Sequence, residues 1–200
     1  MKKPLDFYFD FSSPYGYLAS TQIEALGQAL GRSVIWRPIL LGPMFQAMGS
    51  GPLINIPLKG TYAEHDFARS AQLFDIPYRR PEPFPIATVG AARATLFLRR
   101  QDDALAADFA RRVFDAYYVQ GQDIRDAAVL KAQAQAMGLD PAALEQGMAD
   151  PVIKDALKQE VADAMDRGVF GSPFVFVDNE PFWGFDRFDH IRRWVARQPG

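Results

Sequence analysis

A strand pattern runs directly into a helix pattern at Phe7-Tyr8-Phe9-Asp10-Phe11-Ser12-Ser13-Pro14-Tyr15-Gly16-Tyr17-Leu18-Ala19. Large apolar residues alternate with Asp6, Tyr8 and Asp10, and this period of two puts the phenylalanine rings on one face of a sheet. Ser13 followed by Pro14 is typical of a helix start, with serine at the N-cap and proline at the first helical position. The stretch therefore predicts a strand and a helix joined at Ser13.

The groups at Ser13, where the strand meets the helix, could also bind a ligand. The first turn of a helix carries unpaired N–H groups and a partial positive charge, and the Ser13 hydroxyl adds an O–H donor beside them. Together these groups can hold a thiolate, a phosphate or an oxyanion. The simpler interpretation is a serine that only caps the helix, and the local residues leave both interpretations open.

Composition excludes several classes of function. The 200 residues suffice for one sizeable core, or for a core with an inserted subdomain. A net charge of −2 does not indicate a surface that binds nucleic acid or an anionic membrane. No apolar run approaches the ~20 residues of a membrane-spanning helix. The chain has no cysteine, so any thiol chemistry must use a ligand's thiol. His65 and His190 are isolated, which predicts no metal site, and the expected compartment is the cytoplasm.

The rest of the N-terminal part predicts a strand–helix–strand unit. A single helix is expected from Pro14 to about Leu30, and a second strand at Ser33–Leu40, where Pro38 indicates an edge strand. The glycines and prolines of residues 41–58 predict an irregular loop. Residues 62–167 have a helical pattern, within which Asp123 is a candidate cap for one helix.

The C-terminal part predicts a hairpin and a helix. Phe174 to Val177 is a continuous apolar run, typical of a central strand, with Pro173 at its head. Residues 181–183 follow a turn and supply the partner strand. Asp186 is then the expected cap of a final amphipathic helix.

Three segments resemble a known family. Ser13-Pro14-Tyr15-Gly16 lies where DsbA-like thioredoxin-fold proteins carry Cys-Pro-x-Cys. The whole run of residues 7–19 resembles the opening of the 2-hydroxychromene-2-carboxylate isomerases and the related kappa-class glutathione transferases. In that family a serine replaces the first cysteine and faces the sulfur of bound glutathione, a position that Ser13 matches.

The other two segments lie near the C-terminus. Pro173 matches the family's cis-proline, which turns the N–H and C=O of the preceding residue, Ser172, towards a peptide-like ligand. Trp183-Gly184-Phe185-Asp186-Arg187 resembles the family's Trp-Gly-Asn-Asp-Arg segment, which binds the γ-glutamyl end of glutathione. Phe185 departs from that pattern and removes one polar contact, whereas Asp186 can pair with the ligand ammonium. The resemblance implies a set of glutathione-binding residues: Ser13, Ser172, Pro173, Trp183, Gly184, Phe185 and Asp186.

The resemblance also implies a fold. It is the α/β thioredoxin-like fold, βαβ…ββα with a large all-helical insertion, of DsbA and kappa-class architecture. Residues 1–41 and 168–200 would form a discontinuous thioredoxin-like domain, and residues 42–167 the inserted helical domain. In the family the insertion supplies the substrate pocket, for whose wall the candidates are Tyr15, Asn55, Lys59 and Tyr62. Lys59 could hold a carboxylate, although a solvated surface lysine is the simpler interpretation.

The implied function is a glutathione-dependent isomerase with Ser13 as its catalytic residue. The family reaction interconverts 2-hydroxychromene-2-carboxylate and trans-o-hydroxybenzylidenepyruvate during aromatic hydrocarbon breakdown, by reversible thiolate addition. The expected partners are glutathione, a small aromatic carboxylate and a second copy of the chain. Two alternatives remain open at this point: a kappa-like glutathione transferase, and a non-catalytic thioredoxin-fold binding module.

Overall fold

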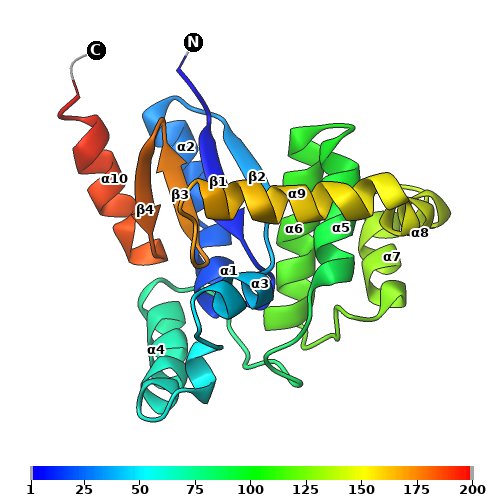
Figure 1. Ribbon diagram of the computed structural model, residues 1–200, viewed down its shortest axis with the longest axis horizontal. Helices are drawn as coiled ribbons and strands as arrows, with labels where there is room; N and C mark the ends of the chain where they lie inside the picture. Colours follow the sequence, from blue (N-terminus) through cyan, green and yellow to red (C-terminus); the bar gives the residue numbers. More distant parts are fainter. Residues whose placement is uncertain (1, 199–200) are drawn as a thin grey trace.

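The computed structural model describes residues 2–198, and within that range the chain forms one mixed sheet of four strands (Figure 1). The strands are β1 (Leu5–Phe9), β2 (Val34–Pro38), β3 (Phe174–Val177) and β4 (Glu180–Trp183), in the order β2-β1-β3-β4. β1 is parallel to β2 and antiparallel to β3, which is antiparallel to β4. This topology confirms the predicted thioredoxin-like fold, with β2 at an edge and β3 inside the sheet.

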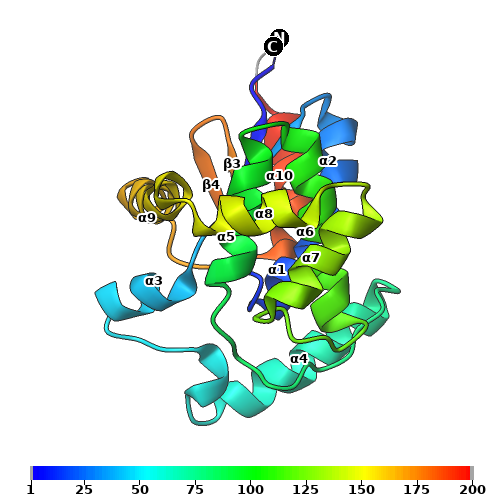
Figure 2. The ribbon, with the colours of Figure 1, turned by 90° about the vertical axis from the view of Figure 1, so that its right-hand side faces the viewer.

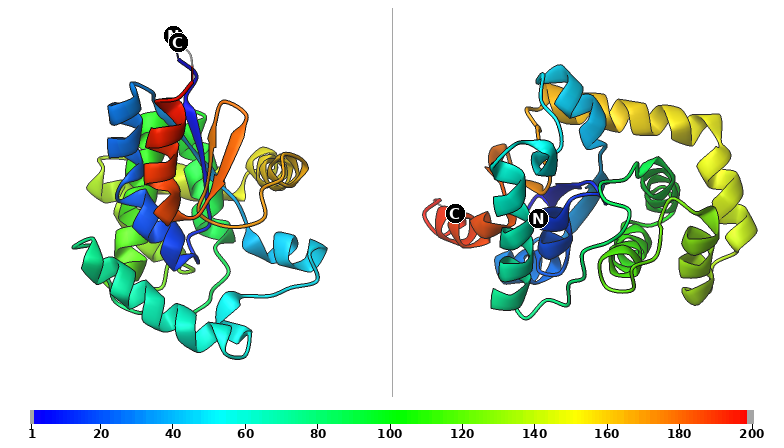
Figure 3. Two further views of the ribbon diagram at one scale, coloured as in Figure 1. Left: turned by 90° about the vertical axis from the view of Figure 1, so that its left-hand side faces the viewer. Right: turned by 90° about the horizontal axis from the view of Figure 1, so that it is seen from below.

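Helices cover both faces of the sheet. One face carries α1 (Pro14–Ser20), α2 (Ile23–Leu30) and α10 (Phe188–Val195), and the other carries α9 (Pro151–Asp166), as Figure 3 shows. The alternation in β1 divides its side chains as predicted. Phe7 and Phe9 join the core on the α1 side, whereas Tyr8 packs with Phe176 on the α9 side.

The helices between β2 and β3 form the bulk of the molecule, and Figure 2 shows α7 and α8 stacked on the outside of α5 and α6. α4 lies across the end of the sheet where β1 runs into α1 (Figure 1). None of the helices within residues 2–198 is long and apolar enough to cross a membrane. The remaining elements are α3 (Leu41–Ala47), η1 (Leu53–Asn55), α4 (Lys59–Leu73), α5 (Val89–Arg99), α6 (Asp103–Tyr118), α7 (Ala127–Ala136), α8 (Pro141–Ala149) and η2 (Phe185–Arg187).

The prediction of one continuous first helix is wrong, because the chain breaks between α1 and α2. Two hydroxyl side chains sit at the break: Ser20 donates to the Tyr17 carbonyl at 2.6 Å, and Thr21 donates to the Leu18 carbonyl at 2.8 Å. Such side-chain bonds to the backbone compete with helix continuation. No glycine or proline marks the break in the sequence.

The prediction of an irregular loop over residues 41–58 is also wrong, since α3 and η1 lie there. Gly42 and Pro43 fall in the first turn of α3, where a missing N–H costs nothing because that group has no partner in the helix. A third difference concerns α7, which is capped by Asp126 through the N–H of Ala128 at 2.8 Å. Asp123 instead bonds Arg125 in the preceding turn.

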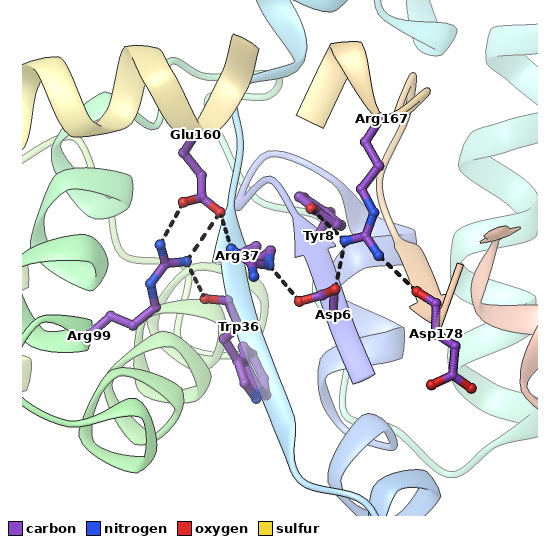
Figure 4. Close-up of polar contacts among 8 residues, drawn as sticks. All are labelled: Asp6, Tyr8, Trp36, Arg37, Arg99, Glu160, Arg167 and Asp178. Carbon is purple, nitrogen blue, oxygen red and sulfur yellow. Dashed lines mark hydrogen bonds and ion pairs between the residues drawn. The ribbon is translucent and has the colours of Figure 1, made fainter. Parts of the chain in front are cut away.

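A chain of ion pairs fastens α5 and α9 to the sheet (Figure 4). Glu160 of α9 bonds Arg99 of α5 at 2.5 Å and Arg37 of β2 at 3.1 Å. Asp6 of β1 continues the chain to Arg37 at 2.7 Å and to Arg167 at 2.6 Å. These side chains are no more than about one third exposed, so their mutual attraction is only partly screened by solvent.

Candidate functional site

The Ser13 hydroxyl joins the start of α1 to the segment that precedes β3. It accepts the N–H of Gly16 at 3.0 Å, which makes Ser13 the N-cap of α1 as predicted. It donates its only hydrogen to the backbone carbonyl of Ser172 at 2.9 Å. The side chain is buried, so the hydroxyl is both a cap and a bridge between two distant parts of the chain.

The Ser172 segment is tied to the same place by further bonds. The Ser172–Pro173 peptide bond is cis. The Ser172 hydroxyl accepts the N–H of Asp10 at 3.0 Å, and the carbonyl of Pro173 accepts the N–H of Gly184 at 3.1 Å. The three segments that the sequence singled out therefore meet at one end of the sheet.

Gly16 leaves no room for a side chain at this meeting point. A Cβ atom built on Gly16 would lie 2.7 Å from the Ser172 hydroxyl oxygen and 3.1 Å from the Ser13 Cβ. The Ser172 hydroxyl thus occupies the space into which a longer residue at position 16 would project. A side chain can be introduced at position 16 only if Ser172 moves.

Trp183 lies on the surface beside the Ser172 segment. Its side chain is 55% exposed, so the structure does not place it in the core. The indole packs against Phe170 with ring centroids 4.9 Å apart and covers Gly171, where a Cβ atom would lie 2.6 Å from the indole nitrogen. Trp183 and Phe170 together present an aromatic surface next to the cis-proline.

Phe185 and Asp186 point in different directions. Phe185 is buried and packs against Phe74 at 5.1 Å and Tyr15 at 6.4 Å, so its ring is part of the core. Asp186 does not cap α10, which corrects the prediction: Asp186 lies within η2, and α10 begins at Phe188 with no side-chain cap. The Asp186 carboxylate is exposed and lies 3.5 Å from the Arg187 guanidinium.

Tyr15 connects the site to α4. Its hydroxyl donates to Asp66 at 2.6 Å, and Asp66 also pairs with Arg69, which in turn donates to the hydroxyl of Tyr62. Burial, followed by the bond to Asp66, raises the pKa of Tyr15 well above its usual range. Burial works to raise the pKa of Asp66, but the donors from Tyr15 and Arg69 outweigh it and the net pKa is lowered.

Asn55 and Lys59 are not joined to this network. Both side chains are exposed, and neither takes part in the side-chain hydrogen bonds found between residues 2 and 198. Lys59 begins α4, while Asn55 ends η1, which packs tightly on α4 because Gly60 lies against the Ile54 carbonyl. The structure therefore links Tyr15 and Tyr62 through Asp66 and Arg69 and leaves Asn55 and Lys59 outside these hydrogen bonds.

Three polar residues at the site were missed from sequence: Asp66, Arg69 and Asp10. Asp10 is buried at 4% exposure and accepts hydrogen bonds from the N–H of Ser12 and the hydroxyl of Thr88. Asp10 continues the alternating pattern of β1, and the one available signal was its place at the end of a strand, three residues before a helix cap.

Two hollows in the surface lie away from Ser13. Two open hollows of about 370 and 360 Å³ share Ser20, Thr21 and Arg111, at the opposite end of α1. Among residues 2–198, no cluster of three or more histidine or acidic side chains could hold a metal ion.

Comparison with known proteins places these features in context. Residues 4–196 match the DSBA-like thioredoxin domain family. The chain is 33% identical to a 2-hydroxychromene-2-carboxylate isomerase of Sphingobium xenophagum, over 98% of this chain and 99% of the relative. It is 27% identical to glutathione S-transferase kappa 1 of Caenorhabditis elegans, over 98% of this chain and 91% of that one. A solved structure of a 2-hydroxychromene-2-carboxylate isomerase superposes with a TM-score of 0.86, at 28% identity over 96% of this chain and 94% of the other.

Proposed function

The chain belongs to the DSBA-like thioredoxin domain family and, within it, to the 2-hydroxychromene-2-carboxylate isomerases, and from this membership we propose that it is a glutathione-dependent cis–trans isomerase. Its substrates would be 2-hydroxychromene-2-carboxylate and trans-o-hydroxybenzylidenepyruvate, or a related aromatic pyruvate, in aromatic hydrocarbon breakdown. The observation that supports the proposal best is the hydroxyl of Ser13, held where three distant segments of the chain meet.

The groups around Ser13 fit glutathione. The donors at the start of α1 suit an anionic sulfur, because the amide of Tyr15 is in the first turn and has no acceptor within the helix. The exposed carboxylate of Asp186 suits an ammonium group. Trp183, three residues before Asp186, offers an exposed aromatic surface to the ligand. The residues proposed to hold glutathione are therefore Ser13, Ser172, Pro173, Trp183, Gly184 and Asp186, with Phe185 contributing its backbone only.

Bound glutathione would supply the thiolate whose reversible addition to the conjugated double bond lets that bond rotate. The role of Ser13 is to make the thiolate available, since a free thiol has a pKa near ~8.5 and is mostly protonated at neutral pH. An O–H donor pointed at the sulfur favours the anion and lowers that pKa. The Ser13 hydroxyl has one hydrogen, which the Ser172 carbonyl accepts in the free chain, so Ser13 must turn that hydrogen from the carbonyl to the sulfur.

The Ser172 carbonyl would then need another donor, because an unsatisfied buried acceptor costs about 1–3 kcal/mol. A peptide-like ligand carries N–H groups that can donate to the Ser172 carbonyl in place of the Ser13 hydroxyl. The chain would thus exchange an internal hydrogen bond for one to the ligand, which favours a peptide thiol over a simple one.

Tyr15 and the residues of α4 would form part of the wall that faces the aromatic substrate. Tyr15 lies two residues from Ser13 and is held by Asp66. Arg69, beside Tyr62, adds a partly exposed positive charge to this wall. Asn55 and Lys59 remain candidates for the same pocket, with Lys59 as a second cation for a carboxylate.

The test measures conversion of 2-hydroxychromene-2-carboxylate with and without glutathione, in the wild type and in Ser13→Ala. The expected result is turnover that requires glutathione and that falls by about 10²–10³-fold in Ser13→Ala, the loss typical of removing one donor to a reacting anion. A variant that keeps full turnover would contradict the role given to Ser13. Glutathione that has no effect on the wild type would instead favour a non-catalytic binding module.

A kappa-like glutathione transferase is the second candidate, favoured by the relative of that name. A transferase would use the same thiolate on an electrophile with a leaving group. Product analysis separates the two activities, because a transferase accumulates a glutathione conjugate whereas an isomerase returns free glutathione.

We further propose that the chain forms a homodimer in the cytoplasm. Within each copy, residues 1–41 and 168–200 would form one domain and residues 42–167 the inserted one. Leu58 and Leu73, at the two ends of α4, are 90% and 73% exposed, which suits a surface that a second copy covers. Sedimentation analysis of the wild type and of a Leu73→Glu variant tests this, since a monomeric wild type would contradict it.

A further inference from the structure

Asp10 is a buried carboxylate for which the proposed chemistry has no use. Its oxygens accept three hydrogen bonds: Oδ1 from the N–H of Ser12 at 2.8 Å and from the hydroxyl of Thr88 at 2.7 Å, and Oδ2 from the N–H of Leu41 at 2.8 Å. Burial raises the pKa of the Asp10 carboxyl, and the donors from Leu41, Ser12 and Thr88 oppose that shift. Burying a carboxylate is unfavourable without such partners, so the three bonds indicate a specific role.

The three partners of this carboxylate belong to three different segments. Ser12 immediately precedes the cap of α1, Leu41 is the first residue of α3, and Thr88 immediately precedes α5. The side chain of Asp10 therefore fixes the starts of three helices at the end of β1. α1 carries the candidate sulfur site, whereas α3 and α5 belong to the helices that follow β2.

The backbone of Asp10 contacts the two serines of the site. Its carbonyl accepts the N–H of Ser13 at 2.9 Å, and its N–H donates to the hydroxyl of Ser172 at 3.0 Å. One residue thus contacts both serines through its backbone and three helix starts through its side chain.

We infer that Asp10 is a positioning residue, which fixes the turn that carries Ser13 against the starts of α3 and α5. The inference rests on the proposed function, in which a sulfur held at Ser13 must meet a substrate bound against the helices that follow β2. Asp10 acts through Ser12, Leu41 and Thr88 and touches no reacting atom. A carboxylate suits this role because both of its oxygens accept and neither donates.

The test uses Asp10→Asn, which keeps the size of the side chain and all its backbone bonds. An asparagine has one acceptor oxygen, so its NH₂ group must face either the N–H of Leu41 or the donors of Ser12 and Thr88. We expect glutathione to bind nearly as well as to the wild type, because the contacts of Ser13 and Ser172 with the backbone of Asp10 remain. We expect kcat/KM for the aromatic substrate to fall about 100-fold, the loss typical of a small misplacement of reacting groups.

Asp6→Asn is the matched control. It makes the same change in β1, the strand that Asp10 follows, where Asp6 pairs with Arg37 and Arg167 and is away from Ser13. It should lower the melting temperature and leave kcat/KM per folded molecule unchanged. Equal losses of glutathione binding and turnover in Asp10→Asn, or no loss of turnover, would overturn the inference.

A readout without ligand separates this inference from the proposed function. Hydrogen exchange should speed up in residues 11–17 and 40–47 of Asp10→Asn, but not in the same peptides of Asp6→Asn. An inactive wild type would contradict the proposed function, whereas unchanged exchange in both peptides of Asp10→Asn would overturn the role of Asp10 whatever the activity. If Asp10→Asn does not fold, Thr88→Val removes one donor and keeps the carboxylate; it should give a smaller change of the same kind, and wild-type exchange and turnover there would also overturn the inference.

Discussion

The hydroxyl of Ser13 lies 2.9 Å from the backbone oxygen of Ser172, a residue 159 positions further along the chain. This one bond links the start of α1 to the segment before β3. An alanine would lose the bond. Serine at position 13 therefore has a structural role beside the chemical role proposed for it, and experiments must separate the two.

Ser13→Ala should affect both roles. Loss of the cap to the N–H of Gly16 costs about 1 kcal/mol. The buried Ser172 carbonyl left without its donor costs about 1–3 kcal/mol more. Urea denaturation should therefore show the free energy of unfolding lowered by about 2–4 kcal/mol. Loss of the O–H donor should raise the pKa of the thiol of bound glutathione, measured by the ultraviolet absorbance of the thiolate. Ser12→Ala is the matched control, because within residues 2–198 the one hydrogen bond of its hydroxyl is from the N–H of Ile86. An equal rise of the thiol pKa in both variants would contradict the role of Ser13.

Gly16→Ala should destabilise the chain through Ser172. The new methyl group would lie 2.7 Å from the Ser172 hydroxyl oxygen, closer than Cβ contacts normally come. Ser172→Ala relieves that contact, so the double variant should be more stable than the sum of the two single changes predicts, by about 0.5–3 kcal/mol in the free energy of unfolding. Gly42→Ala is the control, because beyond the neighbouring residues and the backbone of its own helix nothing lies within 4 Å of the added group. Strict additivity in the double-mutant cycle would contradict the close contact.

Gly171→Ala should move Trp183 without unfolding the protein. The added Cβ would lie 2.6 Å from the indole nitrogen, and the indole is exposed enough to shift. If Trp183 contacts glutathione, the loss of one aromatic contact worth about 1.4 kcal/mol weakens binding about tenfold. Isothermal titration measures the dissociation constant, and tryptophan fluorescence reports the displacement. A Trp183→Ala variant that binds glutathione as well as the wild type would remove Trp183 from the site.

The thioredoxin-like part of the fold could be predicted from sequence because its signals are local. β1 alternates with a period of two, Pro38 marks the edge strand, and the run from Phe174 to Val177 is apolar throughout. The error in the first helix arose where side-chain bonds to the nearby backbone decide where a helix ends. Ser20 and Thr21 break a helix through bonds to the backbone. Such bonds cannot be predicted from the presence of hydroxyl residues in a helical pattern.

The site was predictable only as three segments. That Ser13, Ser172 and Trp183 lie close together follows from the order of the strands, which the family resemblance implied. The polar residues beneath them were not predictable, since Asp10 reads as an ordinary polar position of a strand. Its importance depends on Leu41 and Thr88, which the sequence places far away.

Glu160→Gln should destabilise the attachment of α9 to the sheet. Glu160 is 12% exposed and pairs with both Arg37 and Arg99, so the loss of its charge leaves two partly buried guanidinium groups with weaker acceptors. We expect the free energy of unfolding to fall by about 1–3 kcal/mol. Glu145→Gln, which breaks an exposed pair with Lys131, should cost less than about 1 kcal/mol. Equal effects in urea denaturation of the two variants would contradict a structural role for the buried network.

The tyrosines that pack between α1 and α6 should make the protein sensitive to alkali. Burial, with a smaller contribution from Asp115, raises the pKa of Tyr17 to about 12, and burial raises the pKa of Tyr78 to about 12. Both values lie above the ordinary value of about 10 for an unfolded chain. The stability linked to these groups is therefore fully present below pH ~10 and is lost as the pH rises towards ~12.

A spectrophotometric titration checks this directly, because phenolate absorbs where phenol does not. In the native protein the absorbance should rise in part near pH ~10 and in part only near pH ~12, in step with unfolding followed by circular dichroism. Tyr17→Phe removes one late-titrating group together with its hydrogen bond to the Pro77 carbonyl. This variant should be less stable at neutral pH, yet should lose less stability than the wild type between pH ~10 and ~12. Ionisation of all seven tyrosines in one step near pH ~10, while the chain stays folded, would show that Tyr17 and Tyr78 are open to solvent.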